Sequence, residues 1–344
     1  MPTASIDFTM ASIAMILIVM GAIFGVNMVV SPFNGDSPPN FERYYQIGRY
    51  MLLSQGEPED WGGGGTPSSL GFARTGEPYD LDIDKVTRLN IENVYSLNYS
   101  SLWQSLGVDD VSFRIEVEQM FSIALSLTSS QIQGDDTVYN FTASTTRGGY
   151  PIPCQVSYYV AIRNSTYSDS GSTNSSGSGP VQFTLPNSQN GTGLLIGIAR
   201  TEESVVSYCV LPFTHDSGAP AQAGTFANLS PLNYTLHVDL TSGASAWNGA
   251  IFSYSYSFNL TADGSDYSIP RLLDASPLVL TLTGVNGSDH WAEWVAYPQV
   301  PLQAGADMSD DYLISDVGLV SYIVDIKGAL YKFKIKFRSP AEYD

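Results

Sequence analysis

The stretch that decides the fold class is "FRIEVEQMFSIALSLT", residues 113–128. Apolar and charged side chains alternate strictly over its first six residues. A period of two is the pattern of a β-strand that buries one face and exposes the other. The period changes to two at Ser112, so the sequence predicts that a β-rich part begins near residue 111.

Further strand patterns follow to the C-terminus, separated by turn residues at the spacing of a β-sandwich. They include "CQVSYYVAIR", "VQFTLP", "GLLIGIAR", "SVVSYCVLPF", "NYTLHVDL", "AIFSYSYSFNL", "LVLTLTG", "HWAEWVAYPQV", "LVSYIVDIKG" and "LYKFKIKF". In the last one, Leu330–Phe337, lysines alternate with apolar residues. Two interpretations stay open: a basic stripe that meets an acidic surface of a neighbouring subunit, or lysines that protect an exposed sheet edge.

The N-terminal region is different, because Met10–Val30 is almost entirely apolar. As a helix its 21 residues would be about 32 Å long, enough to span the hydrocarbon of a membrane. Gly21 and Gly25 are four residues apart, a spacing that lets two helices approach closely. Asp7 precedes the apolar segment, and no charge follows until Asp36.

These patterns predict an α+β fold. It has a long N-terminal hydrophobic helix, a short helical region and a β-rich, sandwich-like C-terminal part. The expected domains are residues 1–31, a filament-core or membrane helix; 32–110, a linker and small helical region with a Gly/Pro-rich loop; and 111–344, the β-sandwich-like extracellular part.

Composition argues against several classes of function. Only 14% of the residues are charged, and the net charge of −19 disfavours nucleic-acid binding. His215, His237 and His290 share no metal-ligand spacing, and neither G-x-S-x-G nor H-E-x-x-H occurs. We therefore expect no enzyme activity, no metal and no cofactor other than N-linked glycans.

A glycine-rich stretch, "GEPEDWGGGGTPSSLGFA", lies between the predicted helices. A phosphate-binding loop requires Gly-Lys-Ser/Thr, whereas Gly65 is followed by Thr66 and Pro67. A flexible loop held by Trp61 is the expectation here. Next to it, Asp80–Lys85 lacks the EF-hand pattern, and a calcium site of another type stays an alternative.

Cys154 and Cys209 are the two cysteines of the chain. In an exported protein they would most simply form one disulfide. The alternative is a pair of buried free thiols.

Export is indicated by nine N-x-S/T sequons, all after residue 90. They are Asn98, Asn140, Asn164, Asn174, Asn190, Asn228, Asn233, Asn259 and Asn286. We expect glycans above all at Asn164, Asn174 and Asn190, which flank or lie in Gly/Ser-rich loops. Pro231 makes Asn228 the poorest acceptor, and Asn98 is expected to be bare because it falls in a predicted helix.

The start of the chain resembles archaeal type IV pilins with a class III signal sequence, on the basis of Ser5-Ile6-Asp7-Phe8 followed by the apolar segment. Three further runs resemble a segment of large archaeal pilin-like proteins: Gly56–Gly62, Leu70–Ala73 and Tyr79–Lys85. The resemblance covers about residues 3–118. It implies a prepilin peptidase that removes a leader, storage in the membrane, and extraction by an assembly machinery into a filament core.

The resemblance assigns subunit assembly to Asp7, Phe8, Gly21 and Gly25. Asp7 would meet the free amine of a neighbouring subunit, because a carboxylate inside a helix bundle requires a cation. The expected function is a structural pilin of an extracellular archaeal type IV pilus, with a glycosylated outer domain for adhesion or surface protection. Its partners would be copies of itself, and no nucleic acid. The alternative is a single-pass membrane-anchored surface glycoprotein or a minor tip adhesin.

Overall fold

The computed structural model describes residues 41–215, 226–271, 276–308 and 317–338. Contacts within the chain define two units, Met1–Gln46 and Ile47–Asp344. Helix α2 (Phe41–Leu53) begins in the first unit, and everything after it belongs to the second. The predicted assembly residues Asp7, Phe8, Gly21 and Gly25 lie outside the described residues.

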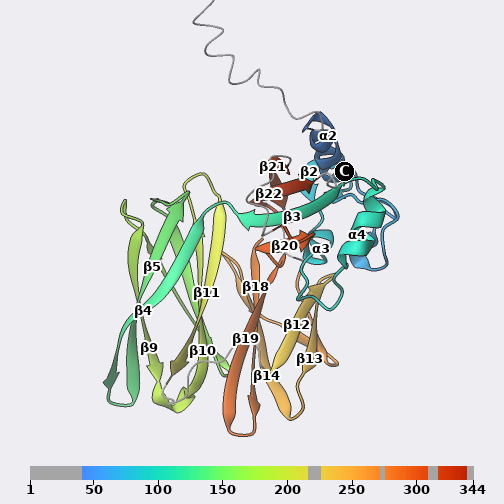
Figure 1. The fold of residues 1–344 in the computed structure, drawn as a ribbon. Helices are drawn as coiled ribbons and strands as arrows, with labels where there is room; N and C mark the ends of the chain where they lie inside the picture. Colours follow the sequence, from blue (N-terminus) through green and yellow to red (C-terminus); the bar gives the residue numbers. More distant parts are fainter. Residues whose placement is uncertain (1–40, 216–225, 272–275, 309–316, 339–344) are drawn as a thin grey trace, which may run out of the picture. The chain divides into compact units, whose positions relative to one another are not determined.

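Four antiparallel sheets make up most of the second unit, and they follow one another from left to right in Figure 1. Sheet 1 consists of β4 (Ser122–Gln133), β5 (Asp136–Arg147), β6 (Tyr150–Pro151) and β9 (Ser178–Pro186). Sheet 2 has the order β11 (Val206–His215), β10 (Gly191–Arg200), β7 (Gln155–Ile162) and β8 (Ser165–Ser172). Sheet 3 has the order β15 (Ser257–Asn259), β14 (Ala244–Phe252), β18 (Leu278–Asn286) and β19 (Asp289–Tyr297). Sheet 4 has the order β12 (Ala227–Leu232), β13 (Thr235–Leu240), β17 (Asp266–Ser268) and β16 (Thr261–Asp263). A short 3-10 helix, η2 (Asn187–Gln189), connects β9 to β10.

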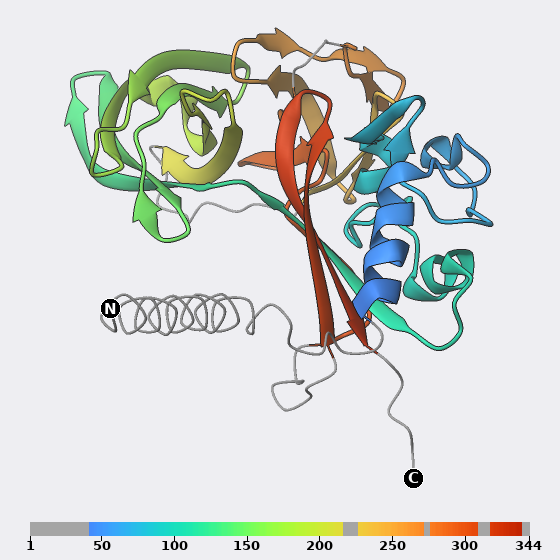
Figure 2. The same ribbon diagram turned by 90° about the horizontal axis from the view of Figure 1, so that it is seen from above.

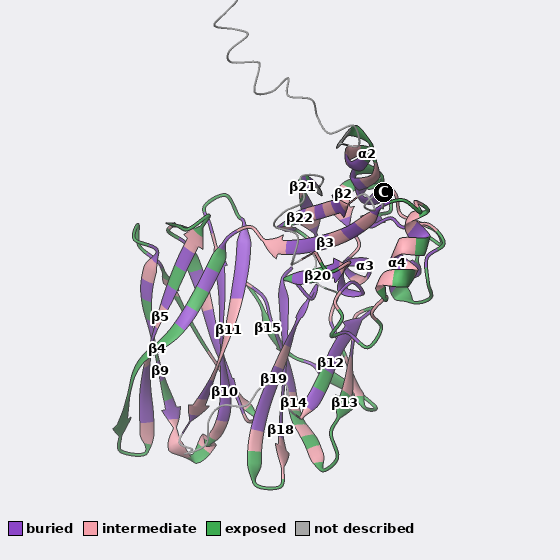
Figure 3. Cartoon of the chain, in the orientation of Figure 1, coloured by how far each residue is buried: buried purple, intermediate pink, exposed green. Residues whose placement is uncertain are grey.

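Sheet 2 is covered on both faces. Leu195 and Ala199 of β10 join a core with sheet 1, whereas Leu194, Ile196 and Ile198 join a second core with sheet 3. All eight central residues of β10 are buried, as the continuous purple of this region illustrates (Figure 3). A strand covered on both faces reads as a continuous apolar run, and "GLLIGIA" is such a run.

Sheet 3 is also enclosed, because sheet 4 covers the face opposite to sheet 2. Leu260 and Tyr267 pack over Gly249 of β14, where an added Cβ would lie 3.2 Å from either side chain. The rings of Phe226 and Trp291 stack with their centroids 6.1 Å apart. The first seven residues of β18 are accordingly all buried.

A mixed six-stranded sheet carries the helical segments. Its order is β1 (Ala73–Arg74), β2 (Glu77–Leu81), β21 (Val317–Ile326), β22 (Ala329–Arg338), β3 (Ser112–Gln119) and β20 (Leu302–Gly305). The helices are η1 (Trp61–Gly63), α3 (Ile83–Thr87) and α4 (Tyr99–Leu106), besides α2. Phe72 packs on Phe333 and Tyr99 packs on Phe113, so one face of this sheet is covered. Strand β3 continues almost directly into β4, which links this sheet to sheet 1 (Figure 2).

The predicted α+β fold class is wrong for the residues that the structure describes, and the predicted N-terminal helix lies outside those residues. Strands make up 58% of the described residues and helices 11%, so the fold is β-rich and sandwich-like. The helices within residues 41–111 are short. Apolar residues of this part, such as Phe72 and Tyr99, cover one face of the six-stranded sheet instead of forming a separate helical layer. Among the described residues, no helix has the length and hydrophobicity needed to cross a bilayer.

Candidate functional site

The glycine-rich stretch is built around a fully buried indole. Trp61 has 0% of its surface exposed, and its Nε1 donates a hydrogen bond of 2.9 Å to the carbonyl of Gly71. The backbones at Gly56 and Gly71 are in contact, since a Cβ on Gly71 would lie 2.4 Å from the nitrogen of Gly56. Two of the motif runs therefore meet at a point where only glycine fits.

Two buried cations complete this cluster. The Nζ of Lys85 lies 5.7 Å from the centre of the Trp61 ring, and the guanidinium of Arg88 lies 5.8 Å from it. Lys85 donates to the carbonyls of Gln55 at 2.8 Å and Ala73 at 3.3 Å. Burial lowers the pKa of both side chains. The backbone carbonyls and the face of the indole stabilise their charged forms.

Arg88 binds the loop in the same way. Its guanidinium donates to the carbonyls of Tyr95 at 3.0 Å and Gly65 at 2.7 Å, and also to the carbonyl of Trp61. A phosphate-binding loop presents N–H groups to its ligand, whereas this loop presents carbonyls to its own cations. The expectation that Trp61 holds the loop is confirmed, and the three motif runs form one structural cluster.

Carboxylates line a hollow of about 550 Å³ beside the glycines, formed by Asp60, Asp82 and Asp84. Asp82 caps α3 by accepting from the backbone of Asp84 and Lys85, both at 3.0 Å. Asp84 accepts from the hydroxyl of Tyr297 at 2.7 Å and from the backbone of Asn233 at 2.8 Å. Burial raises the pKa of Asp84, and the bond from Tyr297 partly offsets this. Within the described ranges, no group of three or more His, Cys, Asp or Glu side chains could hold a metal ion.

The two cysteines are free thiols and the predicted disulfide is not formed. Cys209 pairs with Gly197 of β10, and Cys154 directly precedes Gln155, which pairs with Arg200. The cysteines therefore lie on opposite sides of β10 and are about 13 Å apart along the strands. A disulfide requires Cα atoms within about 7 Å of each other. The alternative of two free thiols is the one observed, and burial raises the pKa of both.

The nine sequons differ in accessibility. Seven have exposed asparagines: Asn98, Asn164, Asn174, Asn190, Asn228, Asn233 and Asn259. Asn140 and Asn286 are half-buried. The amide of Asn140 is bonded on both sides, since its Nδ2 donates to Ser129 at 3.0 Å and its Oδ1 accepts from Gln182 at 2.8 Å. Asn98 caps the start of α4 instead of lying inside a helix.

The basic strand β22 is not at an edge, because it lies between β21 and β3. The Nζ of Lys334 is 2.6 Å from Glu118, and that of Lys336 is 2.6 Å from Glu116. The interpretation of edge protection is therefore wrong. Contact of this stripe with another subunit stays a prediction, although two of its lysines already have partners within the chain.

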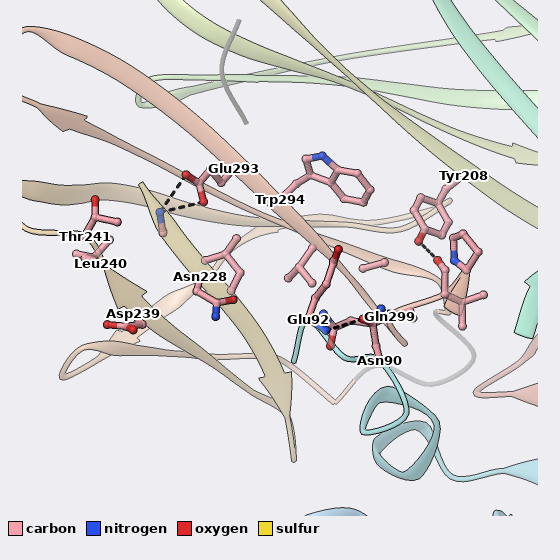
Figure 4. Close-up of a pocket in the computed structure, with 16 residues that line it drawn as sticks. Asn90, Glu92, Tyr208, Asn228, Asp239, Leu240, Thr241, Glu293, Trp294 and Gln299 are labelled. Carbon is pink, nitrogen blue, oxygen red and sulfur yellow. Dashed lines mark hydrogen bonds between the residues drawn. The ribbon is translucent and has the colours of Figure 1, made fainter. Parts of the chain in front are cut away.

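A second candidate for a binding site is a pocket of about 760 Å³ at the border of sheets 3 and 4. It opens between two strands that are not paired with each other, β12 at the edge of sheet 4 and β19 at the edge of sheet 3 (Figure 4). Loop residues Asn90 and Glu92 close one side, and Gln299–Pro301 lie beside them. No sequence pattern indicates this pocket, because its lining residues are spread over more than 200 positions, from Asn90 to Pro301.

Hydrogen bonds hold the edges of β12 and β19 in place at both ends of the pocket. At one end the buried carboxylate of Glu293 in β19 accepts from the backbone nitrogens of Phe226 and Ala227. At the other end Asn93 donates to the side chain of Gln299 at 2.6 Å and to the carbonyl of Pro231 in β12 at 3.0 Å. Asn90 donates to the carbonyl of Gln299 at 3.1 Å. The pocket is therefore formed before any ligand arrives.

Comparisons with known proteins give no family for this chain. No protein-family model and no curated protein matches it. Among solved structures, HBP35 of Porphyromonas gingivalis matches with 11% identity and a TM-score of 0.21, covering 52% of this chain and 64% of that one. Red sea bream transglutaminase matches with 7% identity and a TM-score of 0.20, covering 52% and 31%. This chain thus spans less than two thirds of either protein, and likenesses at these TM-scores carry no argument.

Proposed function

We propose that this protein is a pilin, a structural subunit that polymerises through its apolar N-terminal segment into an extracellular filament resembling the archaeal type IV pilus. The observation that carries the proposal is Asp7 immediately before a 21-residue apolar stretch, Met10–Val30, in a region with no other charge before Asp36. A lone acid is costly in an apolar assembly unless a cation meets it. The free amine of a neighbouring subunit is such a cation.

The body of the protein supports this role as the outer layer of a filament. Its stacked sheets are rich in Ser, Thr and Asn, and seven of nine sequons are exposed. Glycans at exposed positions such as Asn164, Asn174 and Asn190 would coat the filament, and the chain would be held in the membrane before assembly. The second candidate is a membrane-anchored surface glycoprotein or minor tip adhesin, which the preformed pocket favours.

Replacement of Asp7 by Ala tests the proposal in cells that produce the protein. We expect the variant to insert into the membrane normally but to give far fewer filaments, because the pairing with the neighbouring amine is lost. Filaments sheared from the cells are counted by negative-stain microscopy, and their subunit is identified by mass spectrometry. Asp36→Ala is the matched control, since it removes the next acid beyond the apolar stretch. A normal filament yield from Asp7→Ala contradicts the proposed role of this acid.

A further inference from the structure

The pocket between β12 and β19 has the chemistry of a site for a neutral sugar. We infer that it binds a saccharide, with the apolar face of a sugar ring on its floor and the hydroxyls against its rim. This inference goes beyond the filament role and shares with it only an extracellular location.

The floor of the pocket is apolar and partly aromatic. Leu229 of β12 and Val295 of β19 line one part of it, and the half-buried indole of Trp294, on the opposite face of β19, lines the part next to Tyr208. The ring of Trp294 is 6.3 Å from that of Tyr208, whose hydroxyl is bonded to the carbonyl of Val300. Both aromatic residues are therefore fixed in place by the surrounding fold. An aromatic surface of this kind suits the C–H face of a pyranose ring.

The rim supplies hydrogen-bonding groups that the fold does not use. Glu92, Asp239 and Asn228 line the pocket and are exposed (Figure 4). Among the described residues, no side-chain hydrogen bond is made by these three. By contrast, the side chains of Glu293 and Gln299 already accept hydrogen bonds, from the backbone of Ala227 and from Asn93. Carboxylates accept hydrogen bonds from hydroxyls, and the amide of Asn228 donates and accepts.

Charge narrows the ligand class. The pocket is lined by three carboxylates, Glu92, Asp239 and Glu293, and none of its described lining residues is Lys, Arg or His. Phosphorylated, sulfated and acidic sugars are therefore repelled. A cationic ligand would meet the carboxylates, but the amide and hydroxyl groups of Asn228 and Thr241 on the same rim fit neutral hydroxyls better.

Ligand binding in this pocket depends on whether the sequon at Asn228 carries a glycan. A glycan on this residue would occupy the pocket that the ligand needs, because the side chain itself lines it. The inference therefore requires an unmodified Asn228. Pro231, which follows the sequon, agrees with this requirement.

Binding is tested on the full chain in a detergent without a sugar headgroup, by calorimetric titration with the neutral trisaccharides mannotriose, maltotriose and triacetylchitotriose. We expect saturable binding of at least one trisaccharide, and no stronger binding of the cationic probe Nα-acetyl-lysine methylamide. Glu92→Ala and Asp239→Ala should each weaken the affinity about tenfold, the usual effect of removing a hydrogen bond to a charged group. Both side chains are exposed, so the fold tolerates these changes.

The matched control is Asp263→Ala, which removes an exposed carboxylate from sheet 4 outside the pocket and should leave the affinity unchanged. Absence of binding by all three trisaccharides overturns the inference, as does binding that neither pocket variant weakens. Tighter binding of the cationic probe assigns the pocket to amines and overturns it too. Glycopeptide mapping that finds Asn228 modified has the same consequence. The filament test on Asp7 is independent of all four outcomes.

Discussion

At the scale of single residues, Gly71 is the position where the motif runs depend on the absence of a side chain. A Cβ added there would lie 2.4 Å from the nitrogen of Gly56 and 2.5 Å from the carbonyl oxygen of Ser54. Both contacts are with backbone, which has no freedom to move aside. We expect Gly71→Ala to lower the free energy of unfolding by about 2 kcal/mol or more.

Gly63→Ala is the matched control for this prediction, because a Cβ on Gly63 meets nothing within 4 Å. It lies in the same glycine-rich stretch and should change the stability by about 0.5 kcal/mol at most. Denaturant unfolding of the purified chain measures both variants. Equal stabilities would show that the contact between Gly56 and Gly71 relaxes easily and does not hold the cluster together.

The same cluster shows what the sequence could and could not predict about residues. The missing lysine after Gly65 argues against a phosphate loop, and the expectation that Trp61 holds the stretch is confirmed. The roles of Lys85 and Arg88 were not predicted, because their partners are backbone carbonyls from Gln55, Ala73 and Tyr95. Backbone acceptors leave no signature in side-chain composition, so only the folded chain reveals them.

At the scale of elements, β10 differs from an ordinary sandwich strand because successive residues enter two different cores. Leu195 and Ile196 are both fully buried, the first toward sheet 1 and the second toward sheet 3. We expect Leu195→Ala and Ile196→Ala to cost about 2–5 kcal/mol each, since each leaves a cavity in its own core. Denaturant unfolding measures these costs.

Strand β9 provides the comparison, because its residues alternate between buried and exposed. Phe183→Ala should be as costly as the β10 variants, whereas the exposed neighbour Thr184→Ala should change the stability by about 0.5 kcal/mol at most. A near-neutral effect at either Leu195 or Ile196 would mean that one of the two cores does not contribute to stability as the packing indicates.

Strand β22 shows why its place in the sheet was missed. Lysine alternation alone is compatible with an edge, an interface or an internal ladder. The deciding signal was in the opening stretch, where Glu116 and Glu118 repeat with the same period as Lys334 and Lys336. Complementary alternation of this kind favours neighbouring strands. The strands themselves could be read from the sequence, but the stacking of four sheets depends on long-range contacts that no local pattern contains.

At the scale of the whole molecule, the surface that faces the environment is set by which sequons a glycan can reach. Asn164, Asn174 and Asn190 lie at strand ends or in a turn and are exposed. Asn98 is also exposed, and its Oδ1 accepts from the backbone of Ser101 while it caps α4. The structure therefore gives no steric reason for Asn98 to be bare. It gives one for Asn140, which lies within the central part of β5.

We expect Asn140 to be unmodified, and Asn164, Asn174 and Asn190 to carry glycans. The Nδ2 of Asn140 is the atom to which a glycan would be attached, and it already donates to Ser129 on the neighbouring strand. A glycan on the folded chain would replace one of the two hydrogens of this nitrogen and would have to fit between the bonded side chains of Ser129 and Gln182. Glycopeptide mapping of the protein purified from its own cells measures the occupancy, with Ser129→Ala as the control that frees the nitrogen. A glycan on Asn140 together with empty Asn164, Asn174 and Asn190 would contradict the prediction, because the least accessible amide would then be the preferred acceptor.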